Sequence, residues 1–100
     1  MRRVMVRYSV KEGRAQANEE LVRAVYRELH ERVPEGFRYA TFRLDDGVSF
    51  LHVAVLDGDE NPLTVSAAFA AFQSHIGDRL VEGPVQADAT VVGSYRVFTG

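Results

Sequence analysis

The sequence predicts one α+β domain in which two helices cover one face of a four-stranded antiparallel sheet. Hydrophobic residues recur about every two residues in some segments and about every 3.6 residues in others, which indicates strands and helices respectively. These segments follow one another in the order strand, helix, strand, strand, helix, strand. A chain of 100 residues has the length of one domain, which we place at residues 1–100. Right-handed crossover connections then put the first and third strands in the middle, giving the spatial order 4-1-3-2.

The first half of the chain carries a strand, a long helix and a second strand. Apolar and polar residues alternate over residues 4–10, which indicates a strand. Apolar residues three and four positions apart predict a helix over residues 14–33, and Pro34 and Gly36 would end it. The second strand is predicted over residues 37–44.

The second half of the chain is also predicted to form a strand, a helix and a strand, although its sequence does not repeat that of the first half. The Asp-Asp-Gly turn at residues 45–47 predicts a hairpin that leads into a strand over residues 48–56. A helix is expected over residues 66–81, ended by Gly-Pro, and a last strand over residues 86–98. This order of elements is the split β-α-β arrangement called ferredoxin-like.

Alternation assigns each strand residue to one of two sheet faces. An almost wholly apolar set is expected under the helices: Val4, Val6, Tyr8, Ala40, Phe42, Leu44, Leu51, Val53, Val55, Ala89 and Val91. A mixed set is expected on the uncovered face: Met5, Arg7, Ser9, Phe37, Tyr39, Thr41, Arg43, Val48, Phe50, His52, Ala54, Asp88, Thr90, Val92 and Ser94. Such a mixed face indicates an interface or a pocket, and a second copy of the sheet is the simplest cover. We therefore expect a homodimer whose sheets enclose a cavity.

The mixed face carries the candidate site. His52 is suited to proton transfer by its ordinary pKa, although a histidine that hydrogen-bonds across a dimer interface would look the same. Tyr39 and Arg43 on the adjacent strand would bind a planar anionic or phenolic ligand, unless the arginine pairs with Asp88 instead. His52, Arg43 and Tyr39 are the catalytic candidates. The ligand-binding candidates are Arg7, Ser9, Phe37, Thr41, Phe50 and His75.

Composition excludes several classes of function. The net charge of −2 and the absence of a basic cluster argue against nucleic acid as a partner. The sequence has no cysteine, so disulfides and thiolate metal sites are excluded, and a cytoplasmic location is expected. No apolar run reaches the length of a membrane span, and no spacing of His and acidic residues predicts a metal site.

Four segments together resemble the dimeric α+β barrel superfamily, and within it the antibiotic biosynthesis monooxygenase-like domains. They are residues 4–8 (VMVRY), 39–47 (YATFRLDDG), 68–76 (AFAAFQSHI) and 91–95 (VVGSY). The resemblance implies a homodimeric barrel and includes members that work without a cofactor. Haem-degrading members use an Asn on the first strand and a Trp, and this chain has neither. Only His75 stands where their helical His could be, so haem degradation is disfavoured.

Three readings of the function remain open. The first is a cofactor-independent monooxygenase acting on a small aromatic or polyketide-like compound in a cavity between the dimer sheets. There His52 would be the base, Arg43 and Tyr39 would orient the substrate, and Arg7 would stabilise the anion. The second is a non-catalytic ligand-binding or stress-associated dimeric domain. The third is a dimerisation module with a filled interior, plugged by aromatic side chains.

Overall fold

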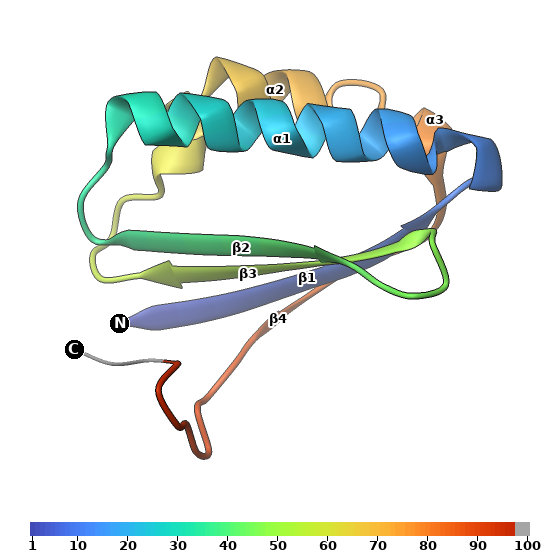
Figure 1. Cartoon of the computed structure of the whole chain (residues 1–100). Helices are drawn as coiled ribbons and strands as arrows, with labels where there is room; N and C mark the ends of the chain where they lie inside the picture. The colour runs from blue at the N-terminus through green and yellow to red at the C-terminus, as the bar shows by residue number, and fades with distance from the viewer. Residues whose placement is uncertain (98–100) are drawn as a thin grey trace.

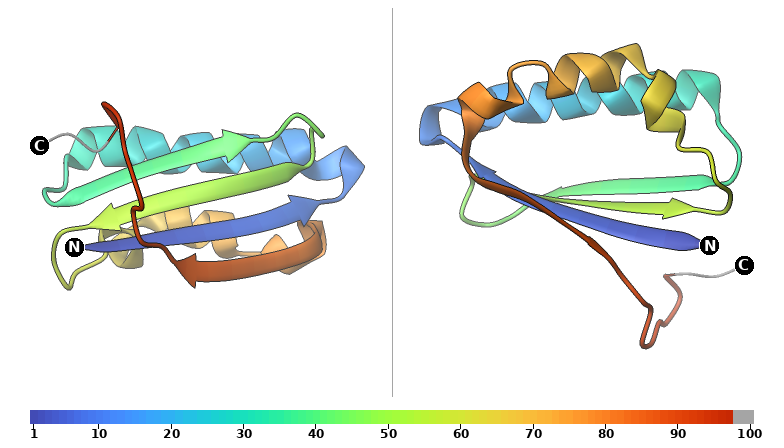
Figure 2. Two further views of the ribbon diagram at one scale, coloured as in Figure 1. Left: turned by 90° about the horizontal axis from the view of Figure 1, so that it is seen from below. Right: turned by 180° about the vertical axis from the view of Figure 1, so that it is seen from behind.

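The computed structural model describes residues 1–97, and they form the predicted two-layer fold. Its main elements are β1 (Arg2–Val10), α1 (Ala15–Arg32), β2 (Phe37–Arg43), β3 (Ser49–Leu56), α2 (Ala67–Gln73), α3 (Ile76–Arg79) and β4 (Leu80–Asp88). Short 3₁₀ turns at Glu12–Arg14 and Pro62–Val65 precede α1 and α2. The strands are antiparallel in the order β2-β3-β1-β4, which confirms the predicted topology. Within residues 1–97 all helices lie on one side of the sheet, and the segment that follows β4 runs across the other side (Figures 1 and 2).

The long helix α1 begins and ends within one residue of its predicted bounds. Val33 has the left-handed backbone conformation of a helix cap, and its N–H donates to the Leu29 carbonyl at 2.8 Å. Val22 and Val25 are buried against the sheet, as the apolar stripe predicts. Asn18 is buried in the same face and is fully inaccessible to solvent, which makes it the unusual residue of this helix.

The prediction of one helix over residues 66–81 is wrong. Ser66 caps the helix start by accepting from the Phe69 N–H at 2.9 Å, but α2 ends at Gln73. His75 takes a left-handed backbone conformation, and only the single turn of α3 follows before β4 begins. The apolar residues Ile76 and Leu80 keep a helical spacing, but Leu80 already pairs with β1. Pairing with β1 therefore outweighs the helical period.

The last strand begins six residues earlier than predicted and is shorter. Gly-Pro at residues 83–84 lies inside β4 rather than before it, at a register irregularity opposite Arg7 and Ser9. Proline is tolerated there because β4 is an edge strand. Of the predicted strand over residues 86–98, the structure forms only the first three residues, and Phe98 lies outside the described residues.

Gly83 should not tolerate a side chain. Its φ is +88°, and an added Cβ would lie 2.8 Å from the Arg7 carbonyl oxygen. Gly83→Ala is therefore expected to lower the free energy of unfolding by about 2–3 kcal/mol, because it combines backbone strain with a steric clash. Urea unfolding measures the effect. Gly58→Ala is the matched control, since nothing lies within 4 Å of its Cβ position, and an equal loss in both variants would contradict the explanation.

The face assignment is right for β1 and wrong for β2 and β3. Tyr8 pairs with Phe50, and His52 pairs with both Val6 and Thr41, so these side chains share one face. Phe50 and His52 are only 1% and 5% exposed, because this is the face that the helices cover. Eight residues predicted on the uncovered face lie on the face under the helices: Phe37, Tyr39, Thr41, Arg43, Val48, Phe50, His52 and Ala54. The sheet face without helices instead carries Met5, Arg7, Ala40, Phe42, Leu51, Val53, Val55, Val85 and Ala87.

The physical reason is that both faces of β2 and β3 are apolar enough to be buried. Aliphatic content alone favoured Leu51, Val53 and Val55 as the core. The core that forms is aromatic, and Tyr8 stacks on Phe50 with ring centroids 5.6 Å apart. Hydrophobicity could not decide between the two faces, because the helices bring the polar partners that make the aromatic face suitable for burial.

Candidate functional site

His52 lies at the centre of a buried hydrogen-bond network under the helices. Its Nε2 is 2.8 Å from the Tyr8 hydroxyl, and its Nδ1 is 2.7 Å from the Tyr39 hydroxyl and 3.1 Å from Thr41 Oγ1. The imidazole also stacks on the Tyr8 ring, with centroids 5.3 Å apart. Burial lowers the pKa of His52 to about 4, so the ring is neutral at physiological pH.

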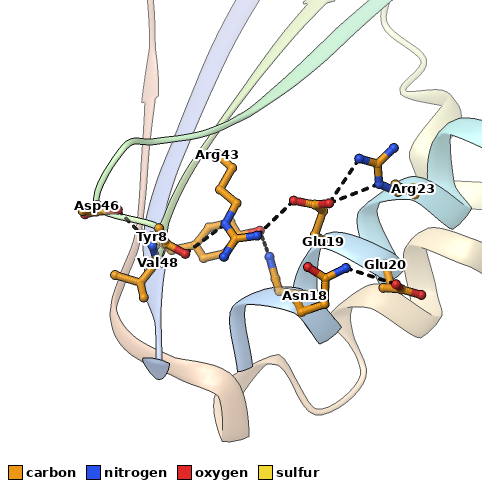
Figure 3. Close-up of polar contacts among 10 residues, drawn as sticks. Tyr8, Asn18, Glu19, Glu20, Arg23, Arg43, Asp46 and Val48 are labelled. Atoms are coloured by element: carbon orange, nitrogen blue, oxygen red, sulfur yellow. Dashed lines mark hydrogen bonds and ion pairs between the residues drawn. The ribbon is translucent and has the colours of Figure 1, made fainter. Parts of the chain in front are cut away.

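Asn18 and Arg79 extend this network into the helical layer. Asn18 Nδ2 donates to the Tyr8 hydroxyl at 2.8 Å, a contact shown in Figure 3. Arg79 Nε donates to Asn18 Oδ1 at 3.1 Å, and its Nη2 donates to the Phe72 carbonyl at 2.7 Å. The Arg79 guanidinium also lies 5.5 Å from the centre of the Phe72 ring. A continuous chain of hydrogen bonds therefore runs from Arg79 through Asn18 and Tyr8 to His52.

The sequence reasoning missed both of these residues. Asn18 stands three and four positions before Leu21 and Val22, so it is a polar residue on the apolar stripe of its helix. Arg79 stands three positions after Ile76 in the same way. A polar side chain at a core position of an amphipathic helix is the signal that could have identified each of them.

The tyrosines of the network are neutral phenols. Burial raises the pKa of Tyr8 to about 12 and, together with the neighbouring Tyr26 and Tyr8, raises the pKa of Tyr39 further. Burial also raises the pKa of Tyr26, whose hydroxyl lies 2.8 Å from Thr41 Oγ1. Each phenol therefore keeps a proton that it can donate to a neighbour or to a ligand.

A cavity of about 230 Å³ adjoins the network between the sheet and α2. Tyr8, Tyr39 and His52 form a polar wall at the network, and further polar residues line the cavity elsewhere: Arg2, Asn61, Gln73 and Gln86. The apolar wall consists of Val4, Val6, Ala54, Leu56, Leu63, Phe69, Phe72 and Ile76. The predicted location between two sheets is thus wrong for His52 and Tyr39, because these residues face a cavity inside one protomer.

A second, open hollow of about 560 Å³ lies between α1 and β2. Arg43 lines it and is held there by Glu19, 3.2 Å away, and by the Gly47 carbonyl, 2.9 Å away (Figure 3). Tyr39 and Thr41 line this hollow as well. Arg43 lies under the helices, as do Tyr39 and His52, but it lines this hollow and not the cavity beside His52.

The structure brings together some of the other candidate residues and separates the rest. Phe37 stacks on Tyr39 at 5.5 Å, and Phe50 stacks on Tyr8, so both phenylalanines support the network. Arg7 and Ser9 belong to the opposite side of β1, where Ser9 Oγ lies 2.8 Å from Ser49 Oγ. His75 is exposed at the break between α2 and α3, 3.7 Å from Asp78. The prediction that Arg7, Ser9 and His75 share a ligand site with His52 is wrong, since they lie elsewhere.

The described part of the chain has no metal-ligand cluster and no membrane-spanning helix. Within residues 1–97, no three His, Asp or Glu side chains are grouped so that they could hold a metal ion. None of the helices described here has the length and hydropathy needed to span a membrane.

The strand order and the two helices on one face of the sheet define the class of structure, which is the α+β ferredoxin-like fold. No family model and no curated protein sequence matches the chain. Solved structures do match. A "putative antibiotic biosynthesis monooxygenase" from Nitrosomonas europaea aligns with a TM-score of 0.74 and 17% identity, over 93% of this chain and 100% of that one. Rv0793 from Mycobacterium tuberculosis aligns with a TM-score of 0.72 and 16% identity, over 93% and 96%.

The same fold also occurs in a protein with a different activity. The L-rhamnose mutarotase FA22100 from Formosa agariphila aligns with a TM-score of 0.58 and 17% identity, over 93% of this chain and 97% of that one. The structural resemblance to antibiotic biosynthesis monooxygenase-like domains is therefore confirmed at the level of the fold. A fold shared by a monooxygenase-type structure and a mutarotase does not identify a reaction, so the function must be argued from the site.

Proposed function

We propose that the cavity beside His52 binds a small ring compound and that the protein is a cofactor-independent monooxygenase acting on it. The observation that carries the proposal is a neutral imidazole, hydrogen-bonded to two phenols, in the wall of a cavity that is lined mainly by apolar side chains. Apolar pockets with a few convergent polar groups are typical ligand sites. The cytoplasmic location expected from the sequence is part of this proposal.

The volume of the cavity limits the substrate. An apolar cavity of about 150 Å³ accommodates benzene, and this cavity measures about 230 Å³. The space suits one aromatic ring with substituents or two small fused rings. Of the compounds considered from the sequence, the volume favours the small aromatic class over a larger polyketide-like one.

The proposed reaction needs an acidic C–H next to a carbonyl group. The C–H proton passes to the Tyr8 oxygen while the Tyr8 hydroxyl proton moves to His52 Nε2, and the Tyr39 hydroxyl stabilises the enolate oxygen that develops. The carbanion adds O₂ to form a peroxide, the proton returns to the peroxide, and loss of water leaves a new C=O bond. A CH₂ group and O₂ thus become C=O and H₂O, with no external reductant. Arg43 and Arg7 have no part in this mechanism because neither lines the cavity.

Replacement of His52 tests the enzymatic proposal. Thermal-shift screening against small ring compounds such as 2-indanone and benzoate should first find a ligand that raises Tm. With 2-indanone as substrate, His52→Asn is expected to slow oxygen consumption about 100-fold or more, while Kd changes less than about threefold. His30→Asn, an exposed histidine on α1, is the control. Unchanged turnover in His52→Asn would remove His52 from the mechanism.

One observation favours the non-catalytic alternative. Both ring nitrogens of His52 already have partners inside the protein, so the network is satisfied without a substrate. A binding or stress-associated domain would give a thermal shift with the same probes and no oxygen consumption. The third reading, a module with a filled interior, is opposed by the cavity itself.

We also propose that the sheet face without helices forms a homodimer. Phe42 is 52% exposed there on β2, and Met5 on β1 and Val85 on β4 are exposed on the same face. An apolar face of this kind is typical of a protein interface, and proteins with this fold are typically dimeric.

Phe42→Glu should convert the dimer to monomer, because two carboxylates would be buried at the interface. Sedimentation equilibrium at about ten micromolar measures the change. Val65→Glu is the control, since Val65 is exposed on the helical side of the molecule. A wild-type protein that sediments only as a monomer would contradict the proposed dimer.

A further inference from the structure

The Arg79–Asn18 contact determines how the Asn18 amide is oriented. Both residues are buried, and Arg79 has only hydrogen-bond donors to offer. Its Nε therefore requires the amide oxygen of Asn18 at 3.1 Å. The amide NH₂ must then face the Tyr8 hydroxyl, 2.8 Å away, so Asn18 donates and Tyr8 accepts.

The orientation of the Asn18 amide also determines which atom donates in the hydrogen bond between Tyr8 and His52. Tyr8 is a neutral phenol with one proton, and its hydrogen-bond partners here are Asn18 and His52. Because Asn18 donates to the hydroxyl oxygen, the Tyr8 proton is directed to His52 Nε2. A neutral imidazole carries one N–H, so that hydrogen lies on Nδ1 and is donated towards Tyr39, 2.7 Å away.

We propose that Asn18 and Arg79 are positioning residues that hold His52 in its Nδ1–H tautomer and so make Tyr39 a hydrogen-bond donor to the ligand. Tyr39 accepts from His52, and its own proton remains for an acceptor in the cavity that it lines. Thr41 Oγ1, the neighbouring oxygen, already contacts Tyr26 and His52. The site therefore selects ring compounds that present a carbonyl or oxyanion oxygen. Only this last step, the choice of ligand, rests on the proposed function.

Asn18→Asp should reverse the direction of the hydrogen bonds that run from residue 18 through Tyr8 and His52 to Tyr39. The side chain at position 18 keeps almost the same shape. One carboxylate oxygen keeps the bond from Arg79, and the other can only accept, so Tyr8 must donate to it. Tyr8 then accepts from His52, which moves the imidazole proton to Nε2. Tyr39, which is nearer to Nδ1 than Thr41 is (2.7 Å against 3.1 Å), then donates to Nδ1 and no longer to a ligand.

Two-bond ¹H–¹⁵N correlation spectra of the ¹⁵N-histidine-labelled protein test the tautomer without any ligand, and the His52 signals are assigned by their loss in His52→Gln. We expect the Nδ1–H form in the wild type and the Nε2–H form in Asn18→Asp. Gln16→Glu makes the same charge change at an exposed position of the same helix and should keep the wild-type form. An Nε2–H wild type, or an unchanged tautomer in Asn18→Asp, would overturn the proposal. If Asn18→Asp does not fold, the wild-type spectrum alone decides.

Ligand binding separates this inference from the proposed function. Acetophenone, which can only accept a hydrogen bond, should bind Asn18→Asp about tenfold more weakly than the wild type. Gln16→Glu should bind it as the wild type does. If the tautomers are as expected but the protein binds no ring compound, the direction of the hydrogen bonds is supported and the proposed function is contradicted. Equal affinity for acetophenone in both proteins would overturn the role assigned to Tyr39.

Discussion

Asn18→Leu should lower the free energy of unfolding by about 3–5 kcal/mol, although leucine has a similar volume and suits a helix. The reason is what the substitution leaves behind. Arg79 Nε loses its acceptor and the Tyr8 hydroxyl loses a donor, both in a region closed to water. Denaturant unfolding followed by circular dichroism measures the loss.

A matched control lies two residues earlier on the same helix. Gln16 is exposed and its amide donates to Glu20 at 3.2 Å on the surface, so Gln16→Leu should change stability by less than about 0.5 kcal/mol. A similarly small change in Asn18→Leu would show that the network contributes little to the stability of the fold.

Stability should also fall as the pH is lowered from about 6.5 to 4, because of His52. Burial lowers its pKa in the folded state to about 4, against 6.5 when it is exposed. Between these values the unfolded state binds more protons, so the stabilisation is complete above pH 6.5 and is lost as pH falls towards 4. The difference corresponds to about 3 kcal/mol when complete. Urea unfolding at pH 7.5 and pH 4.5 measures it.

His52→Gln separates this effect from the carboxylates that titrate in the same acidic range. Hydrogen bonds lower the pKa of Glu19, Glu28 and Asp46, so these groups also contribute acid sensitivity. His52→Gln should lose less stability than the wild type between the two pH values, whereas His75→Gln, at an exposed position, should behave like the wild type. Equal pH dependence in all three proteins would contradict a buried neutral His52.

The elements that the sequence predicts well are those with one strong period and clear ends. The helix over residues 14–33 was placed within one residue, because its stripe is regular and Pro34 ends it. The segment over residues 66–81 was not, because its helical spacing continues into residues that pair with β1. The conflict between helical period and strand pairing is decided by contacts with residues 70 or more positions away, which no local pattern contains.

The candidate site shows the same division. His52, Tyr39, Thr41, Phe37 and Phe50 were grouped correctly, since alternation along paired strands is enough to place them on one face. Which face the helices cover could not be read from alternation, and so Arg7 and Ser9 were added from the wrong side of β1. Shifting a face assignment by one residue moves every side chain of the strand to the other side.

The sequence by itself determined the order of the elements, the sheet topology and which side chains of β2 and β3 lie around His52. Hydrophobic period and connection handedness are local or topological properties, so they can be read from the chain. Only the tertiary structure decided that this group is buried, and that Asn18 and Arg79, 61 positions apart, complete it. Burial of an imidazole requires hydrogen-bond partners, and those partners come from the helices that pack above the sheet.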